Sequence, residues 1–349
     1  MVSRADRVAG KVDQVDALLV TEPANLRYVT GFTGSNGFAV VGRDVRRFVT
    51  DFRYVEQAKL EVPDFDREQG PQELFAALKG FSGRLGFDDA HLSVKQHRRL
   101  GELLPDVELV PLASVVEGVR AVKEPGEILR ISAAAALVDE IYGWLLEVGL
   151  VGRTERDVAV ALEHEMRVRG ASGPSFPSIV ASAEHGALPH AQPREVEIAR
   201  DTLVTIDIGA VLDGYCSDCT RTWATGDVSD ELAEIHALVL RAQVTALDEV
   251  RPGPLGRELD AVARDIITAA GHGDHFGHGL GHGVGLVTHE APRLARTAEV
   301  ALEPGHVVTV EPGVYVPGVG GVRIEDLVVV TESGRDVLSH ASKELLTAD

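Results

Sequence analysis

Apolar and polar residues follow one another in two different ways along the chain, and the pattern changes near residue 120. Before that point, short apolar runs bounded by turn residues predict strands, and two segments with helical spacing predict helices. Strands separated by helices are typical of an α/β domain, here with a mixed sheet. The predicted strands are 15–21, 37–42, 46–51, 83–89 and 107–112, and the predicted helices are 71–81 and 95–104.

Beyond that point the pattern predicts long amphipathic helices around strand-rich segments, which is typical of an α+β domain. Two of the helices begin after a threonine or serine that can act as an N-cap. The predicted elements are helices at 127–148 and 256–270, helices after Thr154 and Ser229, and strand-rich segments at 203–225 and 306–330.

The boundary between the two patterns lies in "EGVRAVKEPGEI", which mixes charged residues with Pro125-Gly126. We therefore expect an N-terminal α/β domain over 1–118, a linker over 119–125 and a C-terminal α+β domain over 126–349.

Composition excludes several classes of protein. The formal net charge of −20 argues against a nucleic-acid partner. The first residues contain no apolar run suited to a signal peptide, and no stretch approaches the roughly 18 apolar residues of a membrane span. Two cysteines make no disulfide framework. These features predict a cytoplasmic protein without a membrane partner.

Two pairs of acidic residues interrupt strand-like runs. Asp207 and Asp218 flank the turn signal Asp213-Gly214, so a hairpin would bring them roughly opposite each other. Like charges across a ladder are destabilising, so either both are solvated or a cation lies between them. Glu311 and Glu325 are placed symmetrically about Gly318. Two such pairs converging on one site would call for about two divalent cations.

The segment "GHGLGHGVGL" (277–286) has a glycine at every second position. In an extended conformation His278 and His282 would share one face, and the bare opposite face would allow close backbone packing. The glycines match no nucleotide-binding motif, and no HExxH motif is present. One imidazole beside four carboxylates makes a nitrogen and oxygen ligand set, which suits Mn²⁺, Co²⁺, Fe²⁺ or Zn²⁺.

Three further features leave alternatives open. His289 would face away from His282 in a regular strand, and a bend after residue 286 would turn it back. His190 lies in the Pro- and Gly-containing loop "GALPHAQP", and an ordinary polar role fits either histidine. Cys216 and Cys219 form a CxxC in a predicted strand, where packing around Asp218 is a simpler role than redox chemistry or a zinc knuckle.

The motifs taken together resemble a known family. "TIDIGAVLDGYCSDCTRT", "GHGLGHGVGLVTHE", "VEPGVYV" and "GVRIED" resemble the dinuclear metallopeptidases of the pita-bread fold, which include methionine aminopeptidase, aminopeptidase P and prolidase. "NLRYVTGFTGSNGFAVV" and "VTDFRYVEQA" resemble the N-terminal domain of prolidases and creatinases. The resemblance implies a creatinase/prolidase-like α/β domain followed by an α+β pita-bread catalytic domain.

The resemblance also implies a cofactor of two divalent metal ions, Mn²⁺, Co²⁺ or Zn²⁺. Asp207 would chelate one ion, His282 and Glu311 would bind the other, and Asp218 and Glu325 would bridge the two.

Roles toward the substrate follow from the same resemblance. His190 and His289 would contact the substrate and stabilise the reacting carbonyl and the leaving group, and Glu311 would pass a proton to the leaving nitrogen. His278 and Arg323 would support the site from neighbouring positions. Phe176 is a candidate for the apolar wall that recognises proline.

The implied activity is metal-dependent hydrolysis of Xaa-Pro bonds by a hydroxide shared between the ions. The compact N-terminal domain favours prolidase, which cleaves dipeptides; the alternative is aminopeptidase P, which acts on longer peptides. A prolidase must bind the free carboxylate of proline, and either Arg323 or an arginine of "GRDVRRF" (42–48) could do so. The expected partners are an Xaa-Pro substrate and a second copy in a homodimer.

Related proteins with other functions fit less well. Creatinase works without metal and lacks the acidic ligands, and methionine aminopeptidase lacks such a first domain. A non-catalytic binding module on this fold should have lost metal ligands, whereas all five positions here hold the expected residue types.

Overall fold

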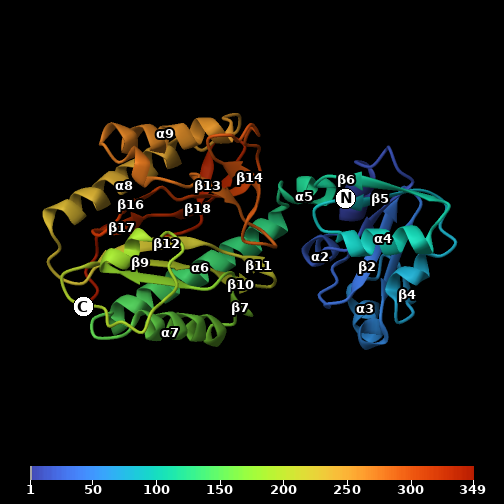
Figure 1. The fold of residues 1–349 in the computed structure, drawn as a ribbon, viewed down its shortest axis with the longest axis horizontal. Coiled ribbons are helices and arrows are strands. Elements are labelled where there is room, and N and C mark those ends of the chain that lie inside the picture. Colours follow the sequence, from blue (N-terminus) through green and yellow to red (C-terminus); the bar gives the residue numbers. More distant parts are fainter. Residues whose placement is uncertain (1) are drawn as a thin grey trace. The chain divides into compact units, whose positions relative to one another are not determined.

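The N-terminal unit, Met1–Arg120, is built on a six-stranded mixed sheet (Figure 1). The computed structural model describes residues 2–349. Strand β1 pairs antiparallel with β2 and parallel with β5. In the order β4-β3-β2-β1-β5-β6, the strands are Asp66–Gln69, Arg46–Thr50, Gly37–Gly42, Ala17–Val20, Gly83–Asp88 and Val107–Leu112.

Short helices accompany this sheet, and most of them have too few turns to show a helical period in the sequence. Predicted helix 71–81 is wrong, because only the 3₁₀ turn Leu74–Leu78 forms there. Strand β4 was not predicted because its sequence, DREQ, is entirely polar and exposed. The helices are α1 (Arg4–Ala9), α2 (Pro23–Thr30), α3 (Val55–Glu61), α4 (Val94–Leu103) and α5 (Val115–Arg120), with a 3₁₀ turn at Phe52–Tyr54.

The second unit, Ala121–Asp349, contains the long helices that the sequence predicts. Three of them begin where the sequence supplies a start signal: Pro125 occupies the first turn of α6, and the side chains of Thr154 and Ser229 cap α7 and α8. The helices are α6 (Pro125–Val148), α7 (Glu155–Val168), α8 (Asp230–Asp248) and α9 (Gly256–Ala269), with 3₁₀ turns at Ala183–Ala187 and Gly273–His275.

The strands of this unit form small, mostly antiparallel sheets. Sheet β12-β9-β8 consists of Cys219–Ala224, Leu203–Ile208 and Ile179–Ser182. Sheet β14-β13-β15-β18-β19 consists of Glu290–Leu294, Gly281–Gly283, Val307–Val310, Asp326–Val330 and Arg335–Val337. The others are β16-β17 (Gly313–Val316, Gly320–Arg323) and β11-β10-β7 (Tyr215–Cys216, Ala210–Leu212, Gly173–Pro174).

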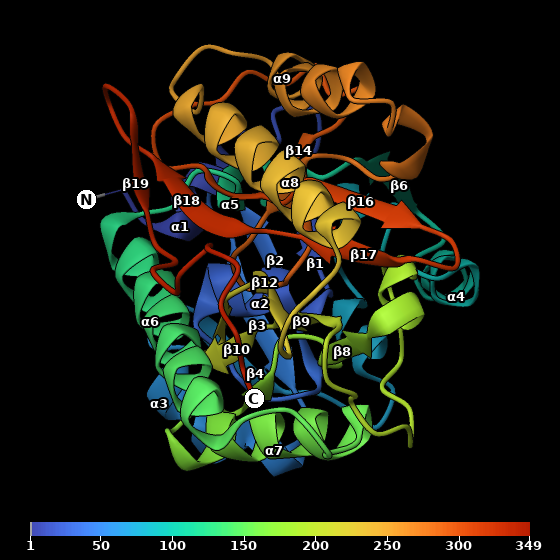
Figure 2. The same cartoon turned by 90° about the vertical axis from the view of Figure 1, so that its left-hand side faces the viewer.

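Helices cover these sheets on two sides. Figure 2 shows α8 and α9 above the strands, and α6 and α7 to the left and below. One apolar cluster joins α8 and α9 to β15 and β18, and another joins α6 and α7 to β8, β9 and β12. Each fully buried large apolar side chain in such a cluster contributes roughly 1.5–3 kcal/mol. The site-bearing strands are therefore held between two packed layers.

Among the described residues, no helix combines the length and apolar character that crossing a bilayer requires.

Candidate metal centre

Four strands or strand ends bring the predicted acidic residues together. Asp207 lies in β9 and Asp218 directly precedes β12, while Glu311 follows β15 and Glu325 directly precedes β18. Gly313 of β16 pairs with Arg323 of β17, so the hairpin is symmetric about Gly318. This is the register that the predicted pairing of Glu311 with Glu325 requires.

The first hairpin differs from the expectation. Asp207 pairs with Thr220, not with Asp218, which lies two residues earlier in the loop before β12. A second short hairpin, β10-β11, takes up the intervening residues, so Asp218 approaches the site from the end of a strand.

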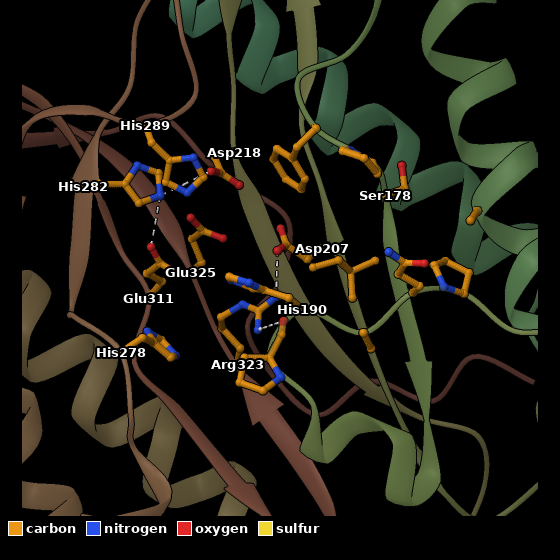
Figure 3. A pocket seen from close by; sticks show the side chains of 18 of the residues that line it. Ser178, His190, Asp207, Asp218, His278, His282, His289, Glu311, Arg323 and Glu325 are labelled. Carbon is orange, nitrogen blue, oxygen red and sulfur yellow. Dashed lines mark hydrogen bonds and ion pairs between the residues drawn. The ribbon is translucent and has the colours of Figure 1, made fainter. Parts of the chain in front are cut away.

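The side chains converge around His282 in one pocket of about 880 Å³ (Figure 3). Nε2 of His282 lies 3.2 Å from Oε1 of Glu311 and 3.6 Å from Oδ2 of Asp218. Asp218, His282 and Glu325 each offer a ligand atom, and these three atoms lie within 4.8 Å of one another. Asp207 lines the same pocket.

The donor atoms fit divalent cations. Asp207 Oδ1 and Glu325 Oε1 are buried and have no hydrogen-bond partner among the described residues. Burial and the neighbouring carboxylates raise the pKa values of Asp218 and Glu325 well above their ordinary range. Burial also opposes ionisation of Glu311, but its contact with His282 outweighs this and holds its pKa at about 2. Buried carboxylates with unused oxygens need a cation to offset their charge.

Hydrogen bonds from neighbouring groups orient the candidate metal ligands. Thr220 Oγ1 donates to Oε2 of Glu325 at 2.7 Å, and Thr309 Oγ1 donates to Oε1 of Glu311 at 3.0 Å. Nδ1 of His282 donates to the carbonyl of Gly283 at 3.1 Å, which leaves the Nε2 lone pair available to a metal.

Arg323 is buried in the pocket wall and its donors are engaged by the protein. Its guanidinium donates to Oδ2 of Asp207 at 2.7 Å and to the Tyr315 hydroxyl at 2.9 Å. It also donates to Thr220 Oγ1 at 2.9 Å and to the carbonyl of Pro189 at 3.2 Å. The Tyr315 hydroxyl lies 2.9 Å from Nε2 of His278, so His278 belongs to the same supporting network.

The remaining histidines line the pocket with Phe176. The ring of His289 lies 4.1 Å from that of His282, centre to centre. Residues 285–289 form bends between β13 and β14, so the strand does not continue regularly from His282 to His289, as a bend after residue 286 requires. His190 lies on the loop between β8 and β9 and faces the acidic residues around His282 from the other side of the pocket (Figure 3).

The glycines beside His282 allow the close packing that their spacing predicts. A Cβ on Gly281 would lie 2.0 Å from the backbone oxygen of Thr309, and one on Gly283 would lie 2.2 Å from that of Ala291. Neither position can therefore accept a side chain without moving the backbone.

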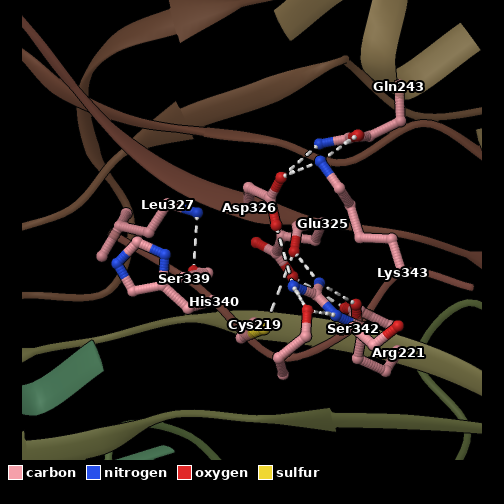
Figure 4. A network of polar contacts seen from close by, with 12 residues as sticks. Cys219, Arg221, Gln243, Glu325, Asp326, Leu327, Ser339, His340, Ser342 and Lys343 are labelled. Carbon is pink, nitrogen blue, oxygen red and sulfur yellow. Dashed lines mark hydrogen bonds and ion pairs between the residues drawn. The ribbon is translucent and has the colours of Figure 1, made fainter. Parts of the chain in front are cut away.

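A second polar network supports Glu325 from behind (Figure 4). Arg221, fully buried on β12, donates to the Glu325 carbonyl and, at 2.8 Å, to Oδ1 of Asp326. Gln243 and Lys343 donate to Oδ2 of Asp326 at 2.9 and 2.7 Å. Every charge in this network is thus paired, which buried charges require.

Several residues of the site were missed at the sequence level. Thr220 and Thr309 lie two residues from Asp218 and Glu311, so strand alternation could have placed Thr309 on the Glu311 face. Arg293 also lines the pocket and is exposed, and its guanidinium makes no hydrogen bond or ion pair with any described residue. No sequence pattern singles out Arg293. Its place beside the pocket follows from the pairing of His282 with Arg293 across β13 and β14.

Comparison with known proteins agrees with this architecture. Residues 130–332 match the model of Metallopeptidase family M24, and residues 7–122 match the Creatinase/Prolidase N-terminal domain. The chain is 44% identical to the uncharacterized peptidase YqhT of Bacillus subtilis, over 95% of this chain and 96% of that one.

Two solved structures are similar over nearly their full lengths. The Xaa-Pro dipeptidase from Bacillus anthracis has a TM-score of 0.96 and 39% identity, with 99% of each chain covered. The X-Pro aminopeptidase from Thermotoga maritima has a TM-score of 0.92 and 34% identity, with 99% of this chain and 100% of that one covered.

The chain belongs to metallopeptidase family M24 and carries a creatinase/prolidase N-terminal domain. It is an enzyme of the pita-bread class, as its motifs predict.

Proposed function

We propose that the protein is an Xaa-Pro dipeptidase that uses two divalent metal ions. The observation that carries this proposal is one pocket lined by the five candidate metal ligands, by His190 and His289, and by Arg293, whose guanidinium makes no hydrogen bond or ion pair with any described residue. The likeness to a dipeptidase structure over the whole chain supports it.

The ligand roles proposed from the sequence are compatible with this arrangement. Asp207 would hold one ion, His282 and Glu311 the other, and Asp218 and Glu325 both. When bound, such ions supply Lewis acidity that activates water and polarises a carbonyl group. Mn²⁺, Co²⁺ and Zn²⁺ all suit these donors.

The protein's own groups would handle protons and orientation. Glu311 lies beside His282 in the pocket, where its carboxylate can accept a proton from the attacking water. Because the nitrogen of an Xaa-Pro bond carries no hydrogen, it must gain a proton to leave, and Glu311 can return one. His190 and His289 line the pocket, where they can hydrogen-bond to the substrate carbonyl and orient it.

Recognition of a C-terminal proline requires an apolar wall and a cation. Phe176, Pro189 and Ile179 line the pocket and offer the apolar surface. The guanidinium of Arg293 is available to a ligand, whereas the donors of Arg323 already contact four protein groups. We therefore assign the carboxylate of proline to Arg293 and a supporting role to Arg323.

The test is hydrolysis of Ala-Pro, Ala-Pro-Ala and Ala-Ala by metal-free protein reloaded with each of the three ions. We expect metal-dependent cleavage of Ala-Pro, with little cleavage of Ala-Ala. Cleavage of neither proline peptide by protein holding two equivalents of metal would refute the proposal.

Aminopeptidase P activity is the second candidate. The pocket volume of about 880 Å³ exceeds what a dipeptide needs, and the similar structure from Thermotoga maritima is an X-Pro aminopeptidase. Preference for Ala-Pro-Ala over Ala-Pro in the same assay would select this activity.

We further propose a homodimer in the cytoplasm. Phe52 and Leu60 of the N-terminal unit are 75% and 84% exposed, which suits a contact surface, and the chain has only two cysteines, both buried. Light scattering after gel filtration measures the mass, and cell fractionation measures the location.

A further inference from the structure

The loop that carries His190 has little regular structure of its own. It leaves β8 at Ser182, passes through the 3₁₀ turn Ala183–Ala187, and supplies residues 189–193 to the pocket wall. Near its middle, the carbonyl of Pro189 accepts a hydrogen bond from Arg323. A loop of this kind needs further fixed points to hold a side chain in one place.

One carboxylate, that of Glu155, contacts both ends of this loop. At the first end it accepts hydrogen bonds from the backbone N–H of Ser182 at 2.9 Å and from its hydroxyl at 2.8 Å. At the other end it accepts from Arg194, through the backbone N–H at 3.0 Å and through Nε and Nη2 at 3.1 Å each. Nδ1 of His185, within the loop, lies 2.9 Å from its Oε2.

The position of Glu155 in the fold explains why a charge is tolerated there. Glu155 is the first residue of α7, where the helix N-terminus favours a negative charge, and its side chain is fully buried. Burial opposes its ionisation, but the hydrogen bonds from Arg194 and Ser182 outweigh burial and hold its pKa at about 2. The contacts are therefore charge-assisted throughout the neutral range.

The same helix also forms part of the pocket. Arg156, Ala159, Val160 and Glu163 of α7 line it, as do the residues that the loop contributes. A carboxylate at the start of α7 thus fixes one wall of the pocket relative to the other.

We propose that Glu155 is a positioning residue, which places His190 for Xaa-Pro substrates by tying both ends of the 183–193 loop to α7. The kinetic consequences of this inference rest on the proposed function. The contacts by which Glu155 holds the loop do not depend on any activity.

The first experiment therefore uses metal-free protein and needs no substrate. Hydrogen-exchange mass spectrometry compares wild type with Glu155→Gln, and with Glu165→Gln as a matched control. Glu165 lies on the same helix and pairs with Arg169 at the end of that helix. We expect Glu155→Gln to speed exchange of amides in 183–193 about tenfold or more, with β9 and β12 unchanged and the control like wild type. Unchanged exchange in the loop would overturn the inference.

The second experiment is a double-mutant cycle with His190→Ala in the metal-loaded enzyme. If Glu155→Gln only moves the His190 side chain out of position, kcat/KM for Ala-Pro should fall about tenfold. If Glu155 acts through His190, the same substitution in the His190→Ala background lowers kcat/KM less than about twofold. An equal loss in both backgrounds would show a general structural role and overturn the inference.

A milder variant covers the case in which Glu155→Gln does not fold. Arg194→Met removes the side-chain contacts at one end of the loop, and because the Arg194 side chain is 40% exposed, the substitution leaves little buried space. It should show the same faster exchange and the same coupling to His190, and additive kinetics would count against the proposal. If wild type cleaves no Xaa-Pro peptide, the proposed function fails. The exchange experiment still tests whether Glu155 holds the 183–193 loop in place.

Discussion

At the scale of single residues, the distinction between Arg293 and Arg323 follows from their surroundings. Arg323 is 3% exposed and contacts four protein groups, whereas Arg293 lines the pocket and its guanidinium makes no hydrogen bond or ion pair among residues 2–349. A buried guanidinium that is paired within the protein, like that of Arg323, stabilises the pocket wall. A guanidinium without a protein partner, like that of Arg293, is available to bind a ligand.

Arg293→Met should therefore weaken binding of Xaa-Pro dipeptides. Loss of a hydrogen bond to a charged group costs about 1.5–3 kcal/mol, so KM for Ala-Pro should rise roughly 10- to 150-fold. Ala-Pro amide, which has no carboxylate, should be affected far less. Arg296→Met is the matched control, since Arg296 is also exposed and lies outside this pocket. Equal losses on both substrates would remove the assignment.

Glu325→Gln should separate metal binding from folding. The change removes one of four crowded carboxylates, so the metal-free variant should be at least as stable as metal-free wild type. Calorimetry should show that Mn²⁺ raises the Tm of wild type, as preferential binding to the folded state requires, while the variant gains little and is inactive. Normal turnover by the variant would contradict the bridging role.

Ionisation of Glu155 makes the free energy of unfolding depend on pH. Its pKa of about 2 in the folded protein lies below its ordinary value of 4.5, so its ionised form stabilises the fold above pH 4.5. That contribution is lost as the pH falls toward the folded pKa. The difference in unfolding free energy between wild type and Glu155→Gln should be constant from about pH 7 to pH 5 and should shrink below it. Urea unfolding measures this difference, and a constant gap down to about pH 3 would argue against the assigned pKa.

At the scale of elements, the glycines of β13 matter through their lack of a side chain. Gly281→Ala would place a methyl group 2.0 Å from a backbone oxygen, so strand β13 would have to move. We expect a loss of about 1–3 kcal/mol or more in stability, together with loss of activity. Gly277→Ala is the control, because a methyl group added there would meet no described atom within 4 Å beyond its chain neighbours. Thermal unfolding of the two variants gives the comparison, and similar Tm values would contradict the packing argument.

The elements also show what a sequence can and cannot predict. Helices α6 to α9 were predictable because each has apolar residues at helical spacing over several turns, and the β16-β17 register follows from the symmetric placement of Glu311 and Glu325. Strand β4 has no apolar residue to reveal it. The offset between Asp207 and Asp218 depends on the extra β10-β11 hairpin, which local patterns do not specify.

At the scale of the whole molecule, the family and its two-part organisation were predictable because the motifs extend over nearly the full chain. The loop contacts of Glu155 were not, since they join residues about 30 to 40 positions apart through side chains in irregular backbone. Contacts of that kind depend on tertiary packing and have no periodic signal.

Removal of residues 341–349 should disable the catalytic unit. Arg221 donates to the carbonyl of Ala341 through Nε at 3.0 Å, and Lys343 pairs with Asp326. Without them, the guanidinium of Arg221 loses its acceptor at Ala341, and Asp326 loses Lys343 but keeps Arg221 and Gln243. A lost hydrogen bond to a charged group costs about 1.5–3 kcal/mol. We expect no cooperative unfolding transition in calorimetry. Glu344→Gln, at an exposed site in the same segment, should behave like wild type.

The same network has a consequence for synthesis in the cell. Residues 341–349 leave the ribosome after every other described part of the catalytic unit, yet they complete the contacts of Arg221 on β12. A nascent chain can therefore form its helices early, but it acquires a finished metal centre only when this late segment has arrived. Chains that stall or are clipped before it would lack these contacts of Arg221 behind Glu325 and should remain inactive.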